Sequence, residues 1–270
     1  EGISLMKTLT KIFGVNGIEY LKILIKHLLR KERVEYLRYF LMGQKKSILR
    51  ILSGAEVVLP NSESEYHRLF KNYKCNTPYH VVSNGVDLNK FKNQNKFIRK
   101  EKSVLCAALI EPRKNQLNLI KALNNTEYSL TIIGSPAPNH LDYLATCKSL
   151  AAQNVTIIDK RVSQEDLINY YESNEIHVLP SWFETTGLSS LEAAYMGCKI
   201  VVTKCGDTVD YFKENALYCN PGEVNSIRLA IEKSHHSPYS DSLKKEIIEK
   251  FNWIQAAQET AKAYKNYFEK

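Results

Sequence analysis

From residue 104 onward, short apolar runs alternate with segments whose apolar positions recur every three or four residues. The first pattern predicts buried strands and the second predicts helices that pack on them. The predicted strands are 104–109, 130–133, 155–158, 176–179, 199–202 and 216–219, and the predicted helices are 115–123, 139–152, 164–172, 187–196, 208–212 and 224–232. Strands that alternate with helices form right-handed βαβ units. We therefore predict an α/β fold with a doubly wound parallel sheet.

The chain before residue 87 has a different, mostly helical pattern. Residues 8–52 predict helix, with breaks near the glycines at 14–17 and at 43. Short strands are predicted at 55–60 and 79–82, on either side of a helix at 63–72. The stretch that follows, to residue 103, is polar and rich in Lys and Asn, which predicts a linker.

The net charge of +8 is concentrated in the helical pattern of residues 20–50. Its cations alternate with apolar residues and are Lys22, Lys26, Arg30, Lys31, Arg33, Arg38, Lys45, Lys46 and Arg50. A basic amphipathic helix can lie on an anionic membrane surface or bind an acidic partner, and a solvated basic face is an equally good interpretation. No nucleic-acid-binding module accompanies the charge, so nucleic acid is not an expected partner.

Composition and cysteine spacing are typical of a globular protein of a reducing compartment. Of its 270 residues, 44% are hydrophobic and 24% are charged. No apolar run approaches the ~20 residues that span a bilayer. The six cysteines have no metal-ligand spacing, so we expect buried free thiols and a cytoplasmic location. The chain begins with Glu1 rather than Met, and we expect it to be part of a longer protein.

Two glutamates mark the junction between the predicted strand 176–179 and the predicted helix 187–196. Glu184 lies in the intervening loop, and Glu192 follows eight positions later, more than one turn inside the helix. The free backbone N–H groups of a helix start favour phosphate. Two carboxylates beside such a start suit a ligand that has both a diphosphate and several hydroxyls. A nucleotide sugar has both.

This segment resembles the E-x7-E signature of the retaining glycosyltransferases of family 4, the group 1 family, which have the GT-B fold. The resemblance continues through an ordered set of further positions, namely Gly187-Leu188, Glu192-Ala193-Ala194, Gly197, Val201-Val202, Gly206 and Asn220-Pro221-Gly222. Such an ordered set is much more specific than two glutamates alone.

GT-B enzymes have two Rossmann-like domains, and the resemblance implies that this chain holds the complete second domain and a mostly helical remnant of the first. Residues 1–86 would be the incomplete tail of the acceptor-side domain, and residues 87–103 the linker. Residues 104–252 would be the nucleotide-sugar-binding domain. Residues 253–270 would form a terminal helix that returns toward the N-terminal part.

The resemblance also implies roles for single residues. Lys114 would contact the donor diphosphate and Glu184 would lie close to the donor sugar, which makes them the candidate catalytic residues. Glu192 would accept hydrogen bonds from the ribose hydroxyls. The other candidates would offer backbone groups to phosphate and sugar, end a strand, or cover the base, and they are Thr185, Thr186, Gly187, Leu188, Gly134, Arg161 and Val162. For the loop at 160–162, an ordinary surface turn is an equally good interpretation.

Two places depart from the family pattern. Leu109 and Ala108 stand where the family has an arginine on the diphosphate, and loss of such a contact costs ~2–4 kcal/mol. Arg113 is the candidate replacement, and a solvated loop residue is the slightly better interpretation of it. Thr185 and Thr186 replace a Gly-Phe pair, so we expect a different sugar pocket.

The expected activity is that of a hexosyltransferase, or of its donor-binding portion, that moves a sugar from a UDP- or GDP-linked donor to an acceptor hydroxyl with retention. The resemblance implies surface polysaccharide or glycolipid assembly, a lipid-linked or oligosaccharide acceptor, and membrane contact through residues 20–50. No cofactor and no metal are expected, because no Asp-x-Asp pair ends a strand. The alternatives are a nucleotide-sugar-binding module or pseudoenzyme and, less favoured, another GT-B enzyme such as a phosphorylase or an epimerase.

Overall fold

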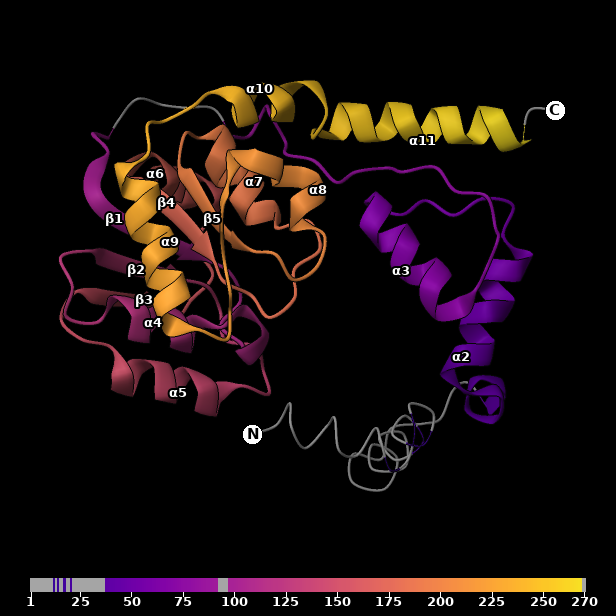
Figure 1. The fold of residues 1–270 in the computed structure, drawn as a ribbon, viewed down its shortest axis with the longest axis horizontal. Coiled ribbons are helices and arrows are strands. Elements are labelled where there is room, and N and C mark those ends of the chain that lie inside the picture. Colours follow the sequence, from indigo (N-terminus) through magenta and orange to yellow (C-terminus); the bar gives the residue numbers. More distant parts are fainter. Residues whose placement is uncertain are drawn as a thin grey trace. The chain divides into compact units, whose positions relative to one another are not determined.

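The structure is a computed structural model that describes residues 12, 14, 17, 20, 37–91 and 97–268 (Figure 1). Contacts between residues divide the chain into two compact units. One unit consists of residues 1–58 and 66–80, and the other consists of residues 59–65 and 81–270. The larger unit contains the region with the predicted α/β pattern.

The described part of the larger unit contains a sheet of six parallel strands in the order β3-β2-β1-β4-β5-β6. The strands are β1 (Lys100–Ala107), β2 (Ser129–Ile133), β3 (Val155–Ile158), β4 (Asn174–Leu179), β5 (Lys199–Thr203) and β6 (Leu217–Cys219). The strand order reverses between β1 and β4, the point where ligands of such sheets bind. The predicted doubly wound sheet is therefore confirmed.

Helices connect the strands and cover the sheet on both faces (Figure 1). The described helices of the larger unit after β1 are η1 (Pro112–Lys114), α4 (Gln116–Leu123), α5 (Leu141–Leu150), α6 (Gln164–Ser173), α7 (Leu188–Tyr195), α8 (Thr208–Phe212), η2 (Lys213–Asn215), α9 (Val224–His236), α10 (Ser242–Glu249) and α11 (Trp253–Phe268), of which the last three follow the last strand. Helix α4 packs against α5 and α9, whereas α6 and α7 pack on the central strands and α10 packs on α7. This alternation gives three layers, with the sheet in the middle.

Burial of apolar side chains holds these layers together. All residues of β4 are buried, and Val104, Leu105 and Cys106 of β1 have no exposed surface. Strands that are apolar on both faces are expected where helices cover a parallel sheet on both sides. His177 of β4 is buried among them beside Ser190, and burial lowers its pKa to about 3. His177 is therefore a neutral core residue.

Strand β1 and helix α10 are two of the elements of the larger unit that differ from the prediction. Strand β1 begins at Lys100, inside the stretch expected to be a linker, because Lys100 pairs with Asn174 although it is exposed to solvent. Helix α10 was not predicted. Only Leu243 and Ile247 of this helix are buried, and two apolar positions are too few to give a helical pattern.

The smaller unit is mostly helical in its described part. Helix α2 (Leu37–Gly54) contains Gly43 with φ 74° and ψ 164°, a conformation outside the helical region, so the predicted break at residue 43 is confirmed. Helix α3 (Glu63–Tyr73) begins where it was predicted. It ends one residue after the predicted end.

The predicted strands at 55–60 and 79–82 are reduced to a single parallel bridge between Val58 and Tyr79. Pro60 and Pro78 flank this bridge. Proline has no N–H group to donate to a ladder, so the pairing does not extend into longer strands.

Most of the basic region at 20–50 lies outside the described residues, including Lys22, Lys26, Arg30, Lys31 and Arg33. Its role in membrane contact therefore stays a prediction. Among the helices that the structure describes, none is both long and apolar enough to cross a bilayer.

Candidate functional site

The two candidate catalytic residues contact each other at the carboxyl edge of the sheet. Lys114 follows β1, Glu184 follows β4, and the Nζ atom of Lys114 lies 2.5 Å from Oε2 of Glu184. Ser181 donates a second hydrogen bond to the same oxygen, at 3.1 Å. The side chains are only 13% and 7% exposed. A buried ion pair with an additional donor holds both charged groups in fixed positions.

A close backbone contact positions Glu184. Its N–H group donates to the carbonyl of Cys205 at 2.9 Å, and its own carbonyl accepts from the N–H group of Asp207 at 2.9 Å. Gly206 lies between these two residues with φ 120°, and a Cβ atom there would come within 1.9 Å of the Glu184 carbonyl oxygen. Only glycine permits this approach, which explains a glycine that the sequence analysis noted without a structural reason.

Asn115 fixes the loop that carries Lys114. This residue has a left-handed conformation with φ 62° and is almost completely buried. Its Nδ2 atom donates to the carbonyls of Pro180, at 3.0 Å, and of Pro221, at 2.9 Å. The β1–α4 loop is thereby tied to the end of β4 and to the turn after β6. In the sequence, Asn115 only marks the start of the predicted helix 115–123, and nothing there indicates this structural role.

The Arg113 side chain takes part in a different set of contacts. Its guanidinium lies 2.9 Å from Oε1 of Glu111 and donates to the carbonyl of Phe183 at 3.3 Å. The side chain is 51% exposed. These contacts fit the interpretation of Arg113 as a loop residue, and they give no geometric support to the prediction that it replaces the missing arginine.

A cavity of about 440 Å³ lies at the ends of β1 and β2 and beside the loop after β3. Its lining includes three candidate residues, Gly134, Arg161 and Val162, and also Leu109. At Gly134 a Cβ atom would come within 1.8 Å of the Ala108 carbonyl oxygen, so glycine allows the two strand ends to pack closely. The volume and the largely apolar lining are typical of a small-molecule site.

Glu192 is connected to this cavity through Tyr171. The hydroxyl of Tyr171, which lines the cavity, donates to Oε2 of Glu192 at 3.0 Å. Burial raises the pKa of Glu192 to about 7, and the hydrogen bond from Tyr171 opposes this shift. No sequence signal points to Tyr171, because an aromatic residue on an amphipathic helix is usually only a core residue.

The start of α7 carries four of the candidate residues. Gly187 precedes the helix with φ 68°, Leu188 is the first helical residue, and Thr185 is exposed. Thr186 is buried, and its Oγ1 atom accepts a hydrogen bond from Nδ2 of Asn84 at 3.0 Å. The hydroxyl that replaces the family's phenylalanine therefore joins the loop to the segment that enters the larger unit.

Six of the candidate residues form two groups. Lys114 and Glu184 form the ion pair, whereas Gly134, Arg161 and Val162 line the cavity, to which Glu192 is connected by Tyr171. The two glutamates thus have different partners. In the described part of the chain, no group of three or more His, Cys, Asp or Glu residues could hold a metal ion. The expectation of a metal-independent site remains a prediction.

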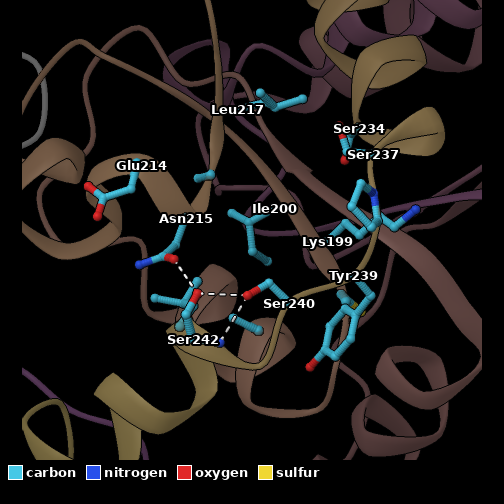
Figure 2. A pocket seen from close by; sticks show the side chains of 15 residues that line it. Lys199, Ile200, Glu214, Asn215, Leu217, Ser234, Ser237, Tyr239, Ser240 and Ser242 are labelled. Carbon is cyan, nitrogen blue, oxygen red and sulfur yellow. Dashed lines mark hydrogen bonds between the residues drawn. The ribbon is translucent and has the colours of Figure 1, made fainter.

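Figure 2 shows a second cavity, of about 290 Å³, at the opposite edge of the sheet, where β5 and β6 begin. Several serine hydroxyls line it, and those of Ser240 and Ser242 lie 2.9 Å apart. Ser242 also donates to Asn215. Since these polar groups bind one another and none of the candidate residues lies here, this cavity is not the candidate site.

Comparisons with known proteins identify the family and agree with the fold described above. The sequence profile described as "Glycosyl transferases group 1" matches residues 87–259. An uncharacterized glycosyltransferase of Methanocaldococcus jannaschii is 27% identical over 177 residues, which cover 61% of this chain and 45% of that protein. D-inositol 3-phosphate glycosyltransferase 2 of Catenulispora acidiphila is 24% identical over 251 residues, which cover 82% and 58%. The chain thus spans about half the length of these relatives.

The solved structures give the same fold. The structure of Anabaena HepE in complex with UDP and glucose matches with a TM-score of 0.70 at 18% identity, and the match covers 83% of this chain and 68% of that one. Because the family profile covers more than half of the sequence, this chain belongs to the group 1 glycosyltransferases and has their GT-B fold.

Proposed function

We propose that the chain is the donor-binding part of a glycosyltransferase that moves a hexose from a nucleotide sugar to an acceptor hydroxyl with retention. The observation that carries this proposal is the buried ion pair of Lys114 and Glu184, at the same sheet edge as the cavity of about 440 Å³. A fixed ammonium, a fixed carboxylate and a cavity suit a donor that has a diphosphate, a sugar and a base. HepE binds UDP in its structure, which supports a nucleoside diphosphate as the ligand class.

Each part of the donor then has a partner. The apolar wall that includes Val162 and Leu167 suits the face of a base. The Glu192 carboxylate accepts hydrogen bonds from the ribose hydroxyls while Tyr171 holds one of its oxygens. The Lys114 ammonium stabilises the charge that develops on the diphosphate as the bond to the sugar breaks. Glu184 holds this ammonium in place before the reaction starts, so the site does not have to reorganise.

In this proposal, the configuration at the anomeric carbon is retained without a nucleophile from the protein. An oxygen of the departing diphosphate takes the proton of the acceptor hydroxyl, which attacks the sugar from the same face. Glu184 is not assigned as the nucleophile, because its Oε2 atom already accepts from Lys114 and Ser181. The role of this carboxylate is to fix the ammonium and to face the donor sugar.

The proposal also includes the acceptor and the cellular process that the reaction serves. We assign the reaction to surface polysaccharide or glycolipid assembly, with a lipid-linked or oligosaccharide acceptor at the cytoplasmic face of a membrane. The basic residues within 20–50 would hold the chain there. Replacement of Lys22, Lys26, Arg30 and Lys31 by Gln should then weaken binding to anionic liposomes. Unchanged binding would remove this part of the proposal.

A nucleotide-sugar-binding module without transfer activity is the second candidate. The observation in its favour is Leu109, which lines the cavity where the resemblance implies an arginine on the diphosphate. A single cation on the leaving group would support binding better than catalysis.

Titration calorimetry with UDP and GDP tests the proposed ligand class. The chain should bind one of the two nucleotides, and binding should weaken at least about tenfold in Lys114→Ala and in Glu192→Ala. Lys121→Ala is a suitable control, because Lys121 is an exposed cation on α4 outside the cavity lining. If neither nucleotide binds, or if the three variants bind equally well, the proposed site is wrong.

A further inference from the structure

The described residues that line the cavity of about 440 Å³ are uncharged, with two exceptions. Lys160 and Arg161 are adjacent residues in the loop between β3 and α6 and are the only charged residues among the described residues that line it. Both charges are positive. The described lining contains no acidic side chain, so it has an excess of two positive charges.

Neither cation has an ion-pair partner among residues 37–91 and 97–268. The adjacent acid, Asp159, is bound instead by Lys148 of α5, with 2.8 Å between Oδ2 and Nζ. Two neighbouring positive charges repel each other, and among the described residues no ion pair offsets this repulsion. An anion with more than one negative charge would offset it.

Two other cations at this sheet edge, Lys114 and Arg113, are already paired. Lys114 is bound to Glu184, and Arg113 is bound to Glu111. The ion pair of Lys114 has no net charge, so it does not balance the charge of a nucleoside diphosphate. Lys160 and Arg161 can supply the missing positive charge, and both form strong charge-assisted hydrogen bonds with phosphate oxygens.

We propose that the side chains of Lys160 and Arg161 bind the phosphate groups of the nucleoside diphosphate rather than only covering its base. This inference rests on the proposed function and adds a second phosphate contact, on the wall of the cavity, to the contact proposed for Lys114. The loop after β3 then sets affinity for the diphosphate. A neutral base would gain little from two charged side chains, whereas a diphosphate gains an attractive interaction with each.

The test compares a nucleoside with its diphosphate. Calorimetric affinities for uridine, UDP, guanosine and GDP are measured for the wild-type chain and for the double variant Lys160→Gln/Arg161→Gln. We expect the affinity for the bound diphosphate to fall about 10- to 100-fold, since a hydrogen bond to a charged group contributes about 1.5–3 kcal/mol. The affinity for the matching nucleoside should change less than about twofold. Added salt should also weaken diphosphate binding less in the variant than in the wild type.

The double variant Lys121→Gln/Lys245→Gln is the matched control, because it removes two exposed cations that do not line the cavity. It should bind both ligands like the wild type. Equal losses for nucleoside and diphosphate in Lys160→Gln/Arg161→Gln would mean that the loop only covers the base, and no loss would mean that both cations are solvated. Either result overturns the inference and leaves the proposed function intact. Absence of any binding by the wild type contradicts the proposed function as well.

A second, independent test uses a substitution at Leu109. Its side chain is 52% exposed and lines the same cavity, so an arginine can replace it without being forced into the core. Leu109→Arg is added to the double variant Lys160→Gln/Arg161→Gln. The resulting triple variant should bind the diphosphate at least about threefold more tightly than the double variant, because the arginine returns a positive charge to the cavity wall. If Leu109→Arg raises only the affinity for the nucleoside, or neither affinity, a phosphate contact in this cavity is contradicted.

Discussion

The ion pair of Lys114 and Glu184 is the most consequential contact between two single side chains of this protein. The two residues are separated by 70 positions in the sequence, and both side chains are nearly buried. Removal of one partner from a buried pair leaves an unbalanced charge, whereas replacement of both by apolar groups is often close to neutral.

We predict that Glu184→Ala lowers the free energy of unfolding by about 3 kcal/mol, because the Lys114 ammonium remains buried without its partner. The double variant Lys114→Met/Glu184→Leu should recover more than half of this loss. Urea denaturation of the wild type and the two variants measures both quantities. Equal stabilities for Glu184→Ala and the wild type would show that the pair is hydrated rather than buried.

Glu192 makes the stability of the fold depend on pH. Burial raises its pKa from 4.5 to about 7, so the folded protein holds a proton that the unfolded chain releases at lower pH. This group therefore stabilises the folded state fully below pH 4.5. That stabilisation is lost as the pH rises through about 7.

We predict that the wild type loses at most about 3 kcal/mol more than Glu192→Gln between pH 5 and pH 8, since one pKa unit corresponds to about 1.4 kcal/mol. The comparison with Glu192→Gln is needed because His177, whose pKa is lowered to about 3, has the opposite effect on stability as the pH rises through 6.5. Urea denaturation at several pH values gives the difference. Parallel pH profiles for the two proteins would exclude a raised pKa at Glu192.

Among the connecting segments, the close approach between the loop after β4 and the loop after β5 positions the candidate site. A Cβ atom at Gly206 would overlap the Glu184 carbonyl oxygen, and φ 120° is strained for any residue with a side chain. We predict that Gly206→Ala lowers the free energy of unfolding by at least about 2 kcal/mol and weakens UDP or GDP binding, because Glu184 must move. Thermal unfolding and calorimetry provide the measurements.

Gly54→Ala is the control for this prediction. Gly54 ends α2, has no unusual φ, and has open space where a Cβ atom would be placed. Its replacement should change the unfolding free energy by less than about 1 kcal/mol. If the two alanine variants were equally stable, the loop contact at Gly206 would not be as close as the structure has it.

Most of the sheet could be predicted from the sequence, because β1, β2, β4 and β5 are apolar runs between turn residues and their burial on both faces requires that pattern. Helix α10 could not be predicted, since it buries only two residues. The contacts within the candidate site could not be predicted from the sequence either. The pairing of Lys114 with Glu184 and the bond from Tyr171 to Glu192 join residues that only the packing of β1, β4, α6 and α7 brings together.

The whole chain consists of two compact units and spans about half the length of its relatives. In the proposed division of roles, the acceptor groups belong to the first GT-B domain, of which this sequence would carry only a remnant. We predict that the chain binds a nucleoside diphosphate but transfers less than about one part in a hundred of the sugar that a complete relative transfers, because one missing catalytic group already costs this much. A radiolabelled donor assay measures transfer. Efficient transfer by the chain alone would contradict the proposed division of roles.

The location of a bound nucleotide is the most direct test of the proposed site. A crystal structure of the chain with UDP or GDP, whichever binds in calorimetry, should show the base in the cavity beside Val162 and Leu167. The ribose hydroxyls should lie within hydrogen-bond distance of Glu192, and a phosphate oxygen within hydrogen-bond distance of Lys114 Nζ. A nucleotide in the cavity at the start of β5 and β6, or one that contacts neither Glu192 nor Lys114, would contradict the donor site proposed for this chain.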